Sequence, residues 1–314
     1  MGAVHPILET YTSTAGHKED ILDLITQISP DETPFLSRLG TSRAHNTYHE
    51  WMTDELTNNA SGEARGEGDS AAPYLLTDKV RWANYTQIDD RAFSITGTEE
   101  AMSHYGLDSQ YAYQLEKAMK ELKIKMEKNL LYGSAAGAGA STADARTLRG
   151  ALSFAVTSGE GESGAASVSA LTESIYNDVL QSMFADGANP KTTFVPGYLK
   201  RRISAFASNN ARYIDMGSSK KLTGVVSVYE SDFGTQEIVL DRWITGIGNT
   251  GVDTGCGLIC DISDLKIAYL RKPFTNPLAV VGDRKSVQIL TEYTLEALAP
   301  THLGYLSAFA TAVA

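Results

Sequence analysis

Residues 108–132 read DSQYAYQLEKAMKELKIKMEKNLLY, and this stretch decides the fold. Its apolar residues recur at steps of three and four, which is the spacing of one face of an α-helix. The apolar stripe consists of Leu107, Tyr111, Leu115, Ala118, Leu122 and Met126. On the polar side, Glu116–Lys120 and Glu121–Lys125 have the spacing of i,i+4 ion pairs. The helix is on the order of 35–40 Å long, so it predicts an elongated subunit.

The first forty residues, ahead of this helix, read as an extended arm that carries one short helix. Its apolar residues at helical spacing are Ile21, Leu24, Ile25 and Ile28. Pro30 and Pro34 are expected to end it. A helix this short cannot bury its own apolar face. Ile25, Ile28 and Phe35 must therefore pack on the main body or on a neighbouring chain.

Between the arm and the long helix, residues 46–54 and 80–96 alternate in the manner of β-strands. Trp51 lies in the first run and Trp82 in the second. Residues 57–72 between them are almost all small, polar or charged, so a long hairpin with a flexible tip is predicted. Two strands alone are marginally stable in water. The tip therefore needs an external surface to rest on.

After the long helix, Gly133 to Ala170 is rich in Gly, Ala and Ser and predicts a mobile excursion from the body. A second helix is predicted from Thr172 to Gly187, then a strand at 192–195 and a third helix after Gly197. Further short strands are expected at 225–229, 237–240, 257–260, 265–270 and 285–298. Helices and strands mix without regular βα alternation, which favours the α+β class.

Composition narrows the classes of function. Lys and Arg number 27 against 38 Asp and Glu, a formal net charge of −11, which argues against tight nonspecific wrapping of nucleic acid. Cys256 and Cys260 are too few for a disulfide framework, and their spacing fits neither a redox pair nor half of a zinc site. We interpret them as buried thiols. With no secretory signal or long apolar run, the chain is expected to work in the cytosol and not in a membrane.

No pattern supports catalysis. Residues 159–164 read GEGESG, a formal match to a dinucleotide fingerprint, but Glu160 and Glu162 would repel a pyrophosphate and a flexible acidic loop is favoured. His45, His49 and Glu50 lie in a strand-like pattern, which is the wrong geometry for a zinc helix. The sequence therefore predicts no catalytic residue, no cofactor and no metal site.

The arm, the unsupported hairpin and the long helix together describe a subunit that its neighbours complete. Charges of both signs at the hairpin tip suit docking against such a neighbour. The residues expected at contacts between subunits are Ile25, Ile28, Phe35, Trp51, Glu63, Arg65, Glu67, Asp69 and Trp82.

Several strings then resemble one known family in order along nearly the whole chain. They are 19–21 (EDI), 28–35 (ISPDETPF), 49–51 (HEW), 84–88 (NYTQI), 96–101 (TGTEEA), 112–115 (AYQL), 148–150 (LRG) and 292–298 (EYTLEAL). This set resembles the SU-ten-type major head, or major capsid, proteins of tailed bacteriophages. Residues 211–255 carry little of the likeness.

The resemblance implies the Hong Kong 97-like capsid fold, an α+β fold, and a division of the chain. Residues 1–40 would form an N-terminal arm, 41–96 an extended E-loop, and 97–170 a peripheral domain with the long helix as its spine. Residues 171–255 would form an axial domain, and residues 256–314 would return to the peripheral domain.

It also implies a structural protein and not an enzyme: copies would self-assemble into hexamers and pentamers of an icosahedral head around double-stranded DNA. The virion would be assembled in the host cytoplasm, with separate scaffold, portal and decoration proteins as further partners. The acidic chain would touch DNA only by weak nonspecific contact. Two alternatives stay open, an encapsulin-like shell that holds cargo enzymes and, far behind, an enzyme with an unrecognised site.

Overall fold

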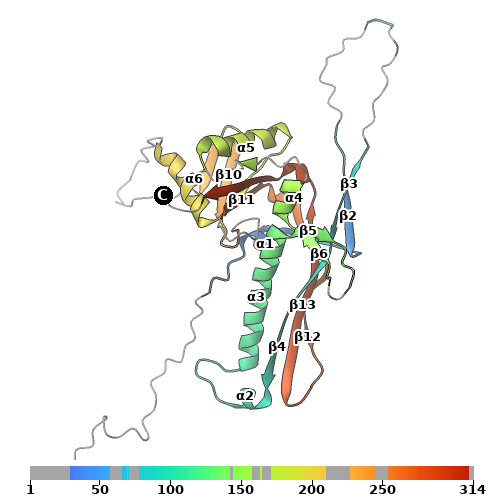
Figure 1. Ribbon diagram of the computed structural model, residues 1–314, viewed down its shortest axis with the longest axis vertical. Helices are drawn as coiled ribbons and strands as arrows, with labels where there is room; N and C mark the ends of the chain where they lie inside the picture. The colour runs from blue at the N-terminus through green and yellow to red at the C-terminus, as the bar shows by residue number, and fades with distance from the viewer. Residues whose placement is uncertain are drawn as a thin grey trace, which may run out of the picture.

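The computed structural model describes residues 29–56, 66–68, 70, 78–141, 144–157, 163–164, 171–209, 227–244 and 254–310. Two sheets, one long helix and a projecting hairpin make up this part of the chain (Figure 1). The hairpin lies at one end of the long axis, and the turn between the two longest strands lies at the other. A helix-covered sheet sits to one side of the long helix. The predicted α+β class is confirmed.

The long helix is α3 (Gln110–Tyr132), which confirms the prediction from its periodicity. It begins at Ser109, whose side chain accepts a hydrogen bond from the amide of Ala112, and it ends at Gly133. The predicted stripe is buried at Ala118, Leu122 and Met126, and burial continues through Leu130 and Leu131. The helix therefore has its most deeply buried part at its C-terminal end.

A four-stranded sheet runs beside α3 in the order β1-β12-β13-β4. Its strands are β1 (Gly40–Arg43), β12 (Leu265–Pro277), β13 (Arg284–Ala297) and β4 (Gln87–Thr96). Lys125 of α3 lies 3.1 Å from the carboxylate of Asp89 on β4, and Glu121 lies 3.6 Å from Arg91. The expected Glu121–Lys125 pair is therefore wrong, because both side chains bind the sheet instead. The expected Glu116–Lys120 pair is confirmed at 3.0 Å.

The second sheet has six strands in the order β7-β14-β11-β8-β10-β9. These are β7 (Ser163–Gly164), β14 (Gly304–Ala310), β11 (Thr254–Cys260), β8 (Thr192–Val195), β10 (Gly234–Leu240) and β9 (Val228–Ser231). Helices α5 (Glu173–Ala185) and α6 (Gly197–Asn209) pack on it around a core that includes Tyr176, Leu180 and Ile203. The predicted helices after Thr172 and Gly197 and the strand at 192–195 are confirmed. Cys256 and Cys260 are buried thiols of β11, which confirms their interpretation.

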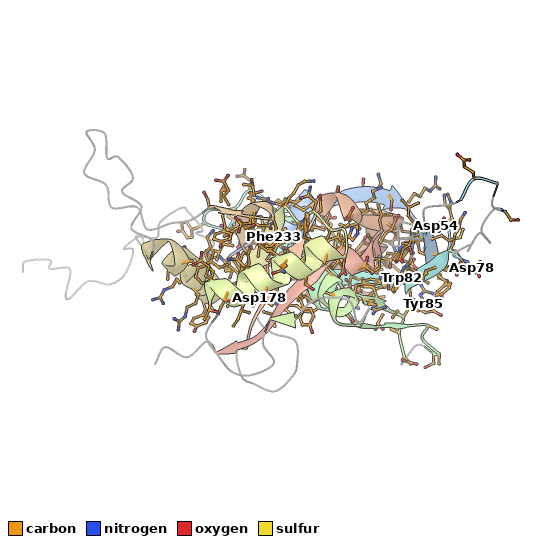
Figure 2. The ribbon with its side chains drawn as sticks, turned by 90° about the horizontal axis from the view of Figure 1, so that it is seen from above. Asp54, Asp78, Trp82, Tyr85, Asp178 and Phe233 are labelled. Atoms are coloured by element: carbon orange, nitrogen blue, oxygen red, sulfur yellow. The ribbon has the colours of Figure 1, made fainter. Side chains whose placement is uncertain are left out.

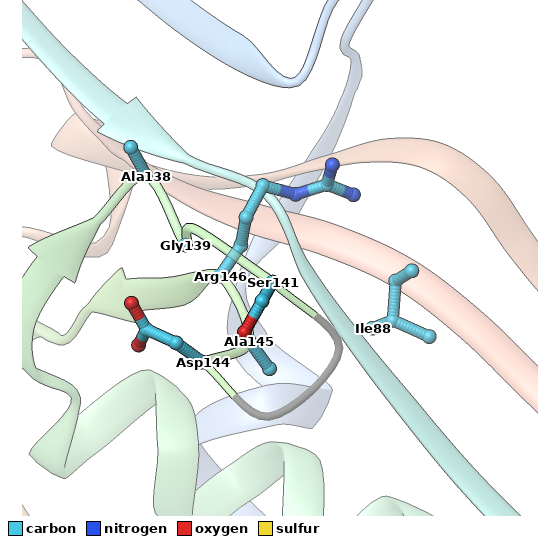
Figure 3. A pocket seen from close by; sticks show the side chains of 7 residues that line it. All are labelled: Ile88, Ala138, Gly139, Ser141, Asp144, Ala145 and Arg146. Carbon is cyan, nitrogen blue, oxygen red and sulfur yellow. The ribbon is translucent and has the colours of Figure 1, made fainter.

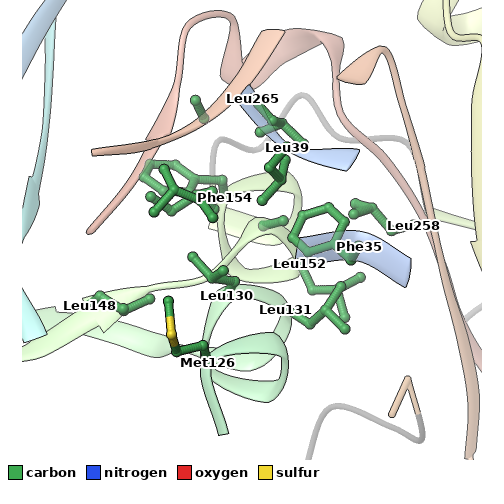
Figure 4. Packing of buried hydrophobic residues seen from close by; sticks show 14 of the residues in the cluster. Phe35, Leu39, Met126, Leu130, Leu131, Leu148, Leu152, Phe154, Leu258 and Leu265 are labelled. Carbon is green, nitrogen blue, oxygen red and sulfur yellow. The ribbon is translucent and has the colours of Figure 1, made fainter. Parts of the chain in front are cut away.

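The prediction of a mobile excursion is wrong for residues 134–137 and 147–157, which form regular secondary structure. The chain forms β5 (Ser134–Gly137), β6 (Thr147–Arg149) and α4 (Ala151–Thr157). Leu148, Leu152 and Phe154 are at most 1% exposed and lie in the main core with Leu130 and Leu131 (Figure 4). The surrounding segment is rich in small residues, and the short apolar run from Leu148 to Phe154 within it completes this core. Residues 158–162 and 165–170 of the predicted excursion lie outside the described part of the chain.

Other boundaries also differ from the sequence prediction. Residues 80–96 form two strands, β3 (Val80–Tyr85) and β4, which belong to different sheets, so the hairpin is made by β2 (Tyr48–Thr53) and β3 alone. Pro34 does not end a helix: it begins α1 (Pro34–Arg38), because the fixed φ of proline and its missing N–H suit the first position of a helix. The predicted helix around residues 21–28 lies outside the described residues.

Three short helical segments, absent from the sequence prediction, connect these elements. They are α2 (Gly97–Ala101), η1 (Ile262–Asp264) and η2 (Pro300–His302). In addition, β11 and β14 share a sheet with β8 and β10, so strands from both sides of the expected boundary at residues 255 and 256 lie together.

Gly150 provides a sharp test of how the end of α3 packs. A Cβ atom at this position would lie 2.5 Å from the backbone nitrogen of Gly133 and 2.8 Å from the carbonyl of Leu131. Gly150→Ala should therefore lower the free energy of unfolding by about 1–3 kcal/mol, the usual cost of overpacking. Urea denaturation measures the change. Gly197→Ala is the matched control because no atom lies within 4 Å of its added Cβ, and equal stability of the two variants would contradict this packing.

Phe154 tests whether α4 belongs to the core. Its side chain is fully buried, so Phe154→Ala should cost about 3–5 kcal/mol of unfolding free energy. Phe184→Ala, at a phenylalanine of α5 that is 59% exposed, should cost under about 1 kcal/mol. Thermal unfolding of both variants checks this, and a small effect at Phe154 would mean that residues 151–157 are not part of the core.

Candidate assembly surfaces

The β2–β3 hairpin has one face on the main core and one face outward. Its register pairs Trp51 with Trp82 and Tyr48 with Tyr85. Trp51 is 9% exposed, and its ring centroid lies 6.0 Å from that of Phe154. Trp82 is half-buried and donates a hydrogen bond to Thr53 Oγ1. The two tryptophans therefore fix the base of the hairpin on its own subunit.

Buried polar contacts hold the same base. The side chain of Asn84 donates to the carbonyls of Leu295 and Arg149 and accepts from the amide of Arg149. His49 Nε2 lies 3.4 Å from Glu296 Oε2. This hydrogen bond is the main cause that lowers the pKa of the Glu296 carboxyl group below its ordinary value. The hairpin therefore leaves the body in a defined direction.

Past this base the hairpin has little support from its own chain. Met52 is 67% exposed and Leu56 is 98% exposed. Figure 2 shows Asp54 and Asp78 at the outer end of the described hairpin, beyond Trp82. Apolar side chains on a projecting element mark a surface for another molecule.

The arm reaches the body through a second site, which we call the arm root (residues 29–39). Phe35 is fully buried, and its ring meets that of Phe194 edge to face at a centroid distance of 5.2 Å. The backbone amides of Phe35 and Leu36 donate to the two carboxylate oxygens of Glu127, at 2.8 and 2.6 Å. Burial raises the pKa of Glu127 to about 8. The arm root is therefore bound to α3 by a buried acid.

Exposed contacts add to this attachment. Arg38 makes a two-pronged hydrogen bond to Glu237, with both N···O distances at 2.7 Å. The indole N–H of Trp243 donates to the carbonyl of Glu32, and Lys128 lies 4.6 Å from the centre of the Trp243 ring. The arm root thus contacts both α3 and the six-stranded sheet.

A buried ion network stiffens the sheet beneath the hairpin. Glu292 of β13 is 4% exposed and accepts hydrogen bonds from Arg146, Arg271 and Thr86 Oγ1. A buried carboxylate with two cationic partners is expensive to disrupt, because removal of one partner leaves a charge away from water. The network therefore joins β13 to the loop before β6.

The described residues offer no catalytic arrangement. No group of three or more His, Cys, Asp and Glu side chains in them could hold a metal ion. An open pocket of about 350 Å³ lies between Ile88 and residues 138–141 and 144–146 (Figure 3). It is lined mostly by small residues, and the guanidinium group of Arg146 is engaged by Glu292. No helix among the described residues is long and apolar enough to span a bilayer.

The residues predicted at contacts between subunits fall into three groups. Phe35 and Trp51 are buried in their own chain, and Trp82 is half-buried at the hairpin base. The sequence left open whether Phe35 packs on the main body or on a neighbouring chain, and the structure places it on the main body. Glu67 is exposed. The remaining five lie outside the described residues: Ile25, Ile28, Glu63, Arg65 and Asp69.

Sequence reasoning missed Glu127 and Asp241, the buried acids below the arm root. Glu127 lies outside the predicted apolar stripe of the long helix, so helical periodicity does not predict its burial. The signal that could have found it is its place between Met126 and Leu130, where the apolar stripe widens.

Comparisons with known proteins agree with this architecture. The model of a family described as SU10 major capsid protein matches residues 8–310. A curated relative named major capsid protein, from Escherichia phage Phieco32, is 33% identical over 131 residues. That match covers 42% of this chain and 37% of the relative, so the chain spans less than two fifths of the relative's length.

Solved structures show the same fold at low sequence identity. A structure from Gordonia phage Cozz matches with a TM-score of 0.64 at 10% identity and covers 96% of this chain and 94% of that one. The capsid of a native GTA particle matches with a TM-score of 0.64 at 10% identity. The match covers 97% of this chain and 100% of that one. The SrpI encapsulin from Synechococcus elongatus matches with a TM-score of 0.58 at 9% identity, and the match covers 98% of each chain.

The family match extends from the arm to the last strand, and the matches to solved capsid structures cover almost the whole chain. The chain therefore belongs to the SU10 major capsid protein family, has the Hong Kong 97-like capsid fold, and is a structural protein and not an enzyme.

Proposed function

We propose that this protein is the major capsid protein of a tailed bacteriophage, whose copies assemble into the hexamers and pentamers of an icosahedral head. The observation that carries the proposal is the family match over residues 8–310. The projecting hairpin supports it physically, since Met52 and Leu56 are 67% and 98% exposed among the described residues. Permanent interfaces that could cover such surfaces bury from about 2,000 Å² upward.

In this proposal the hairpin and the arm of each copy lie on adjacent copies. Ile25, Ile28 and the tip residues Glu63, Arg65, Glu67 and Asp69 are the contacts we propose. The proposed division of the chain is an arm (1–40), an E-loop (41–96), a peripheral domain (97–170 and 256–314) and an axial domain (171–255). Residues 171–209 and 227–244 supply α5, α6 and strands of the six-stranded sheet, which fits an axial domain.

The proposed particle encloses double-stranded DNA and is assembled in the host cytoplasm. The net charge of −11 favours weak, nonspecific contact with DNA, which lets the packaged polymer move. Separate scaffold, portal and decoration proteins are further proposed partners.

An encapsulin-like shell is the second candidate, because the SrpI encapsulin has the same fold. Neighbouring genes separate the two: terminase, portal and tail genes favour a virus, whereas an adjacent gene for a cargo enzyme favours a compartment. The phage reading ranks first because the family model and the curated relative are both capsid proteins.

Electron microscopy of the purified full chain tests the proposal. Negatively stained preparations should contain pentamers, hexamers or closed shells. A protein that stays a monomer at high concentration would contradict the proposal.

A hairpin variant tests the proposed contact. Replacement of residues 54–79 by Asn-Gly would connect Thr53 to Val80 through a two-residue hairpin turn. These two residues already face each other across the strands. Because Trp51 and Asn84 stay in place, the variant should keep the thermal stability and circular dichroism of the wild type, yet it should form no closed shells. Shells in wild-type yield would mean that the hairpin tip contributes nothing to assembly.

A further inference from the structure

Two acidic side chains meet below the arm root. Glu127 lies on α3, and Asp241 directly follows β10; both residues are 0% exposed. Their carboxyl groups are within hydrogen-bonding contact of each other. We call these two side chains the acid pair. They lie at the junction of α1, α3 and the six-stranded sheet.

The hydrogen bonds of the acid pair require one proton. Both oxygens of Glu127 accept backbone amides, from Phe35 and Leu36, and Asp241 Oδ1 accepts the amide of Trp243 at 2.8 Å. The fourth oxygen, Asp241 Oδ2, is buried and meets no donor among the described residues. Two ionised carboxylates cannot hydrogen-bond to each other, so a buried pair in contact holds one proton between them.

We propose that Glu127 and Asp241 share one proton and hold the arm root on α3 only while that proton is present. With the proton, Glu127 accepts the amides of Phe35 and Leu36 and the pair carries a single charge. Without it, two like charges repel each other in an apolar site. The element that can leave is α1, which has five residues. The inference rests on the proposed function, in which the arm reaches a neighbouring subunit.

The charged groups around the acid pair are engaged elsewhere. Arg38 binds Glu237, Arg242 lies 3.4 Å from Glu32, and Lys120 lies 3.6 Å from Asp31. Lys128 stacks on Trp243, and Lys200 donates to the carbonyl of Ile238. These cations bind other partners nearer to solvent and do not pair with Glu127 or Asp241. The shared proton is therefore what lowers the charge of the acid pair.

The direction of the pH effect follows from burial. Burial raises the pKa of Glu127 from its ordinary value of 4.5 to about 8, and it also raises the pKa of Asp241. Between these two pH values the folded subunit binds more protons than the unfolded one, so its stability falls as pH rises. The hold on the arm root is therefore fully present below about pH 4.5, weakens as the pH rises, and levels off only where Glu127 is fully ionised, above its raised pKa.

Hydrogen exchange of the full-length protein measures this hold directly. Protection of the amides of residues 35 and 36, corrected for the intrinsic pH dependence of exchange, should fall about tenfold or more between pH 5 and pH 8. In Asp241→Asn the new amide donates to Glu127, which keeps both backbone amides as in the protonated pair. Protection should then stay constant across this range.

Two further variants complete the test. Glu230→Gln changes an exposed acid on β9 and should keep the wild-type pH profile. Glu127→Gln provides a second route if Asp241→Asn does not fold. It removes the titration but leaves one amide without an acceptor, so protection should be lower and independent of pH. A flat wild-type profile, or an Asp241→Asn profile that follows the wild type, would overturn the proposal.

Electron microscopy of the same preparations separates this inference from the proposed function. Shells without pH-dependent protection would remove the role of the acid pair and leave the capsid function in place. pH-dependent protection without shells would keep the acid pair and remove the capsid function.

Discussion

The structure depends on the burial of the C-terminal end of α3. Met126, Leu130 and Leu131 meet α1 on one side and α4 with β6 on another, and they lie in one core with residues from β8 and both long strands. At about 25 cal/mol per Å² of buried apolar surface, burial at this junction contributes to the stability of the whole subunit. The same part of α3 carries Glu127, so the arm root is attached at this buried junction.

The opposite arrangement applies to the hairpin. Its base is fixed by Trp51 and Asn84, whereas its outer part exposes apolar side chains to water. A subunit built in this way has a stiff body and unsatisfied projections, which suits a protein whose family assembles into shells. The residues that stabilise the subunit are therefore different from those that we propose for assembly.

The sequence could predict elements whose apolar pattern is long or dense. The repeat from Tyr111 to Met126 spans many turns, so the long helix was found with nearly correct ends, as was the strand at 192–195. Residues 148–155 were misinterpreted because their apolar run is short and lies among Gly, Ala and Ser. Burial of Glu127 could not be predicted from periodicity, because its partners, the amides of Phe35 and Leu36, lie more than 90 residues away.

Strand pairing determines when the four-stranded sheet can fold during synthesis of the chain. β1 pairs with β12, with Gly40 beside Lys266, and β4 pairs with β13, with Gln87 beside Tyr293. Long-range pairings of this kind form only after the intervening loop closes. A nascent polypeptide on the ribosome therefore cannot complete the four-stranded sheet until β13 (Arg284–Ala297) has emerged. Products that end before residue 284 lack Leu295 and Glu296 of β13, which bind Asn84 and His49 at the base of the hairpin.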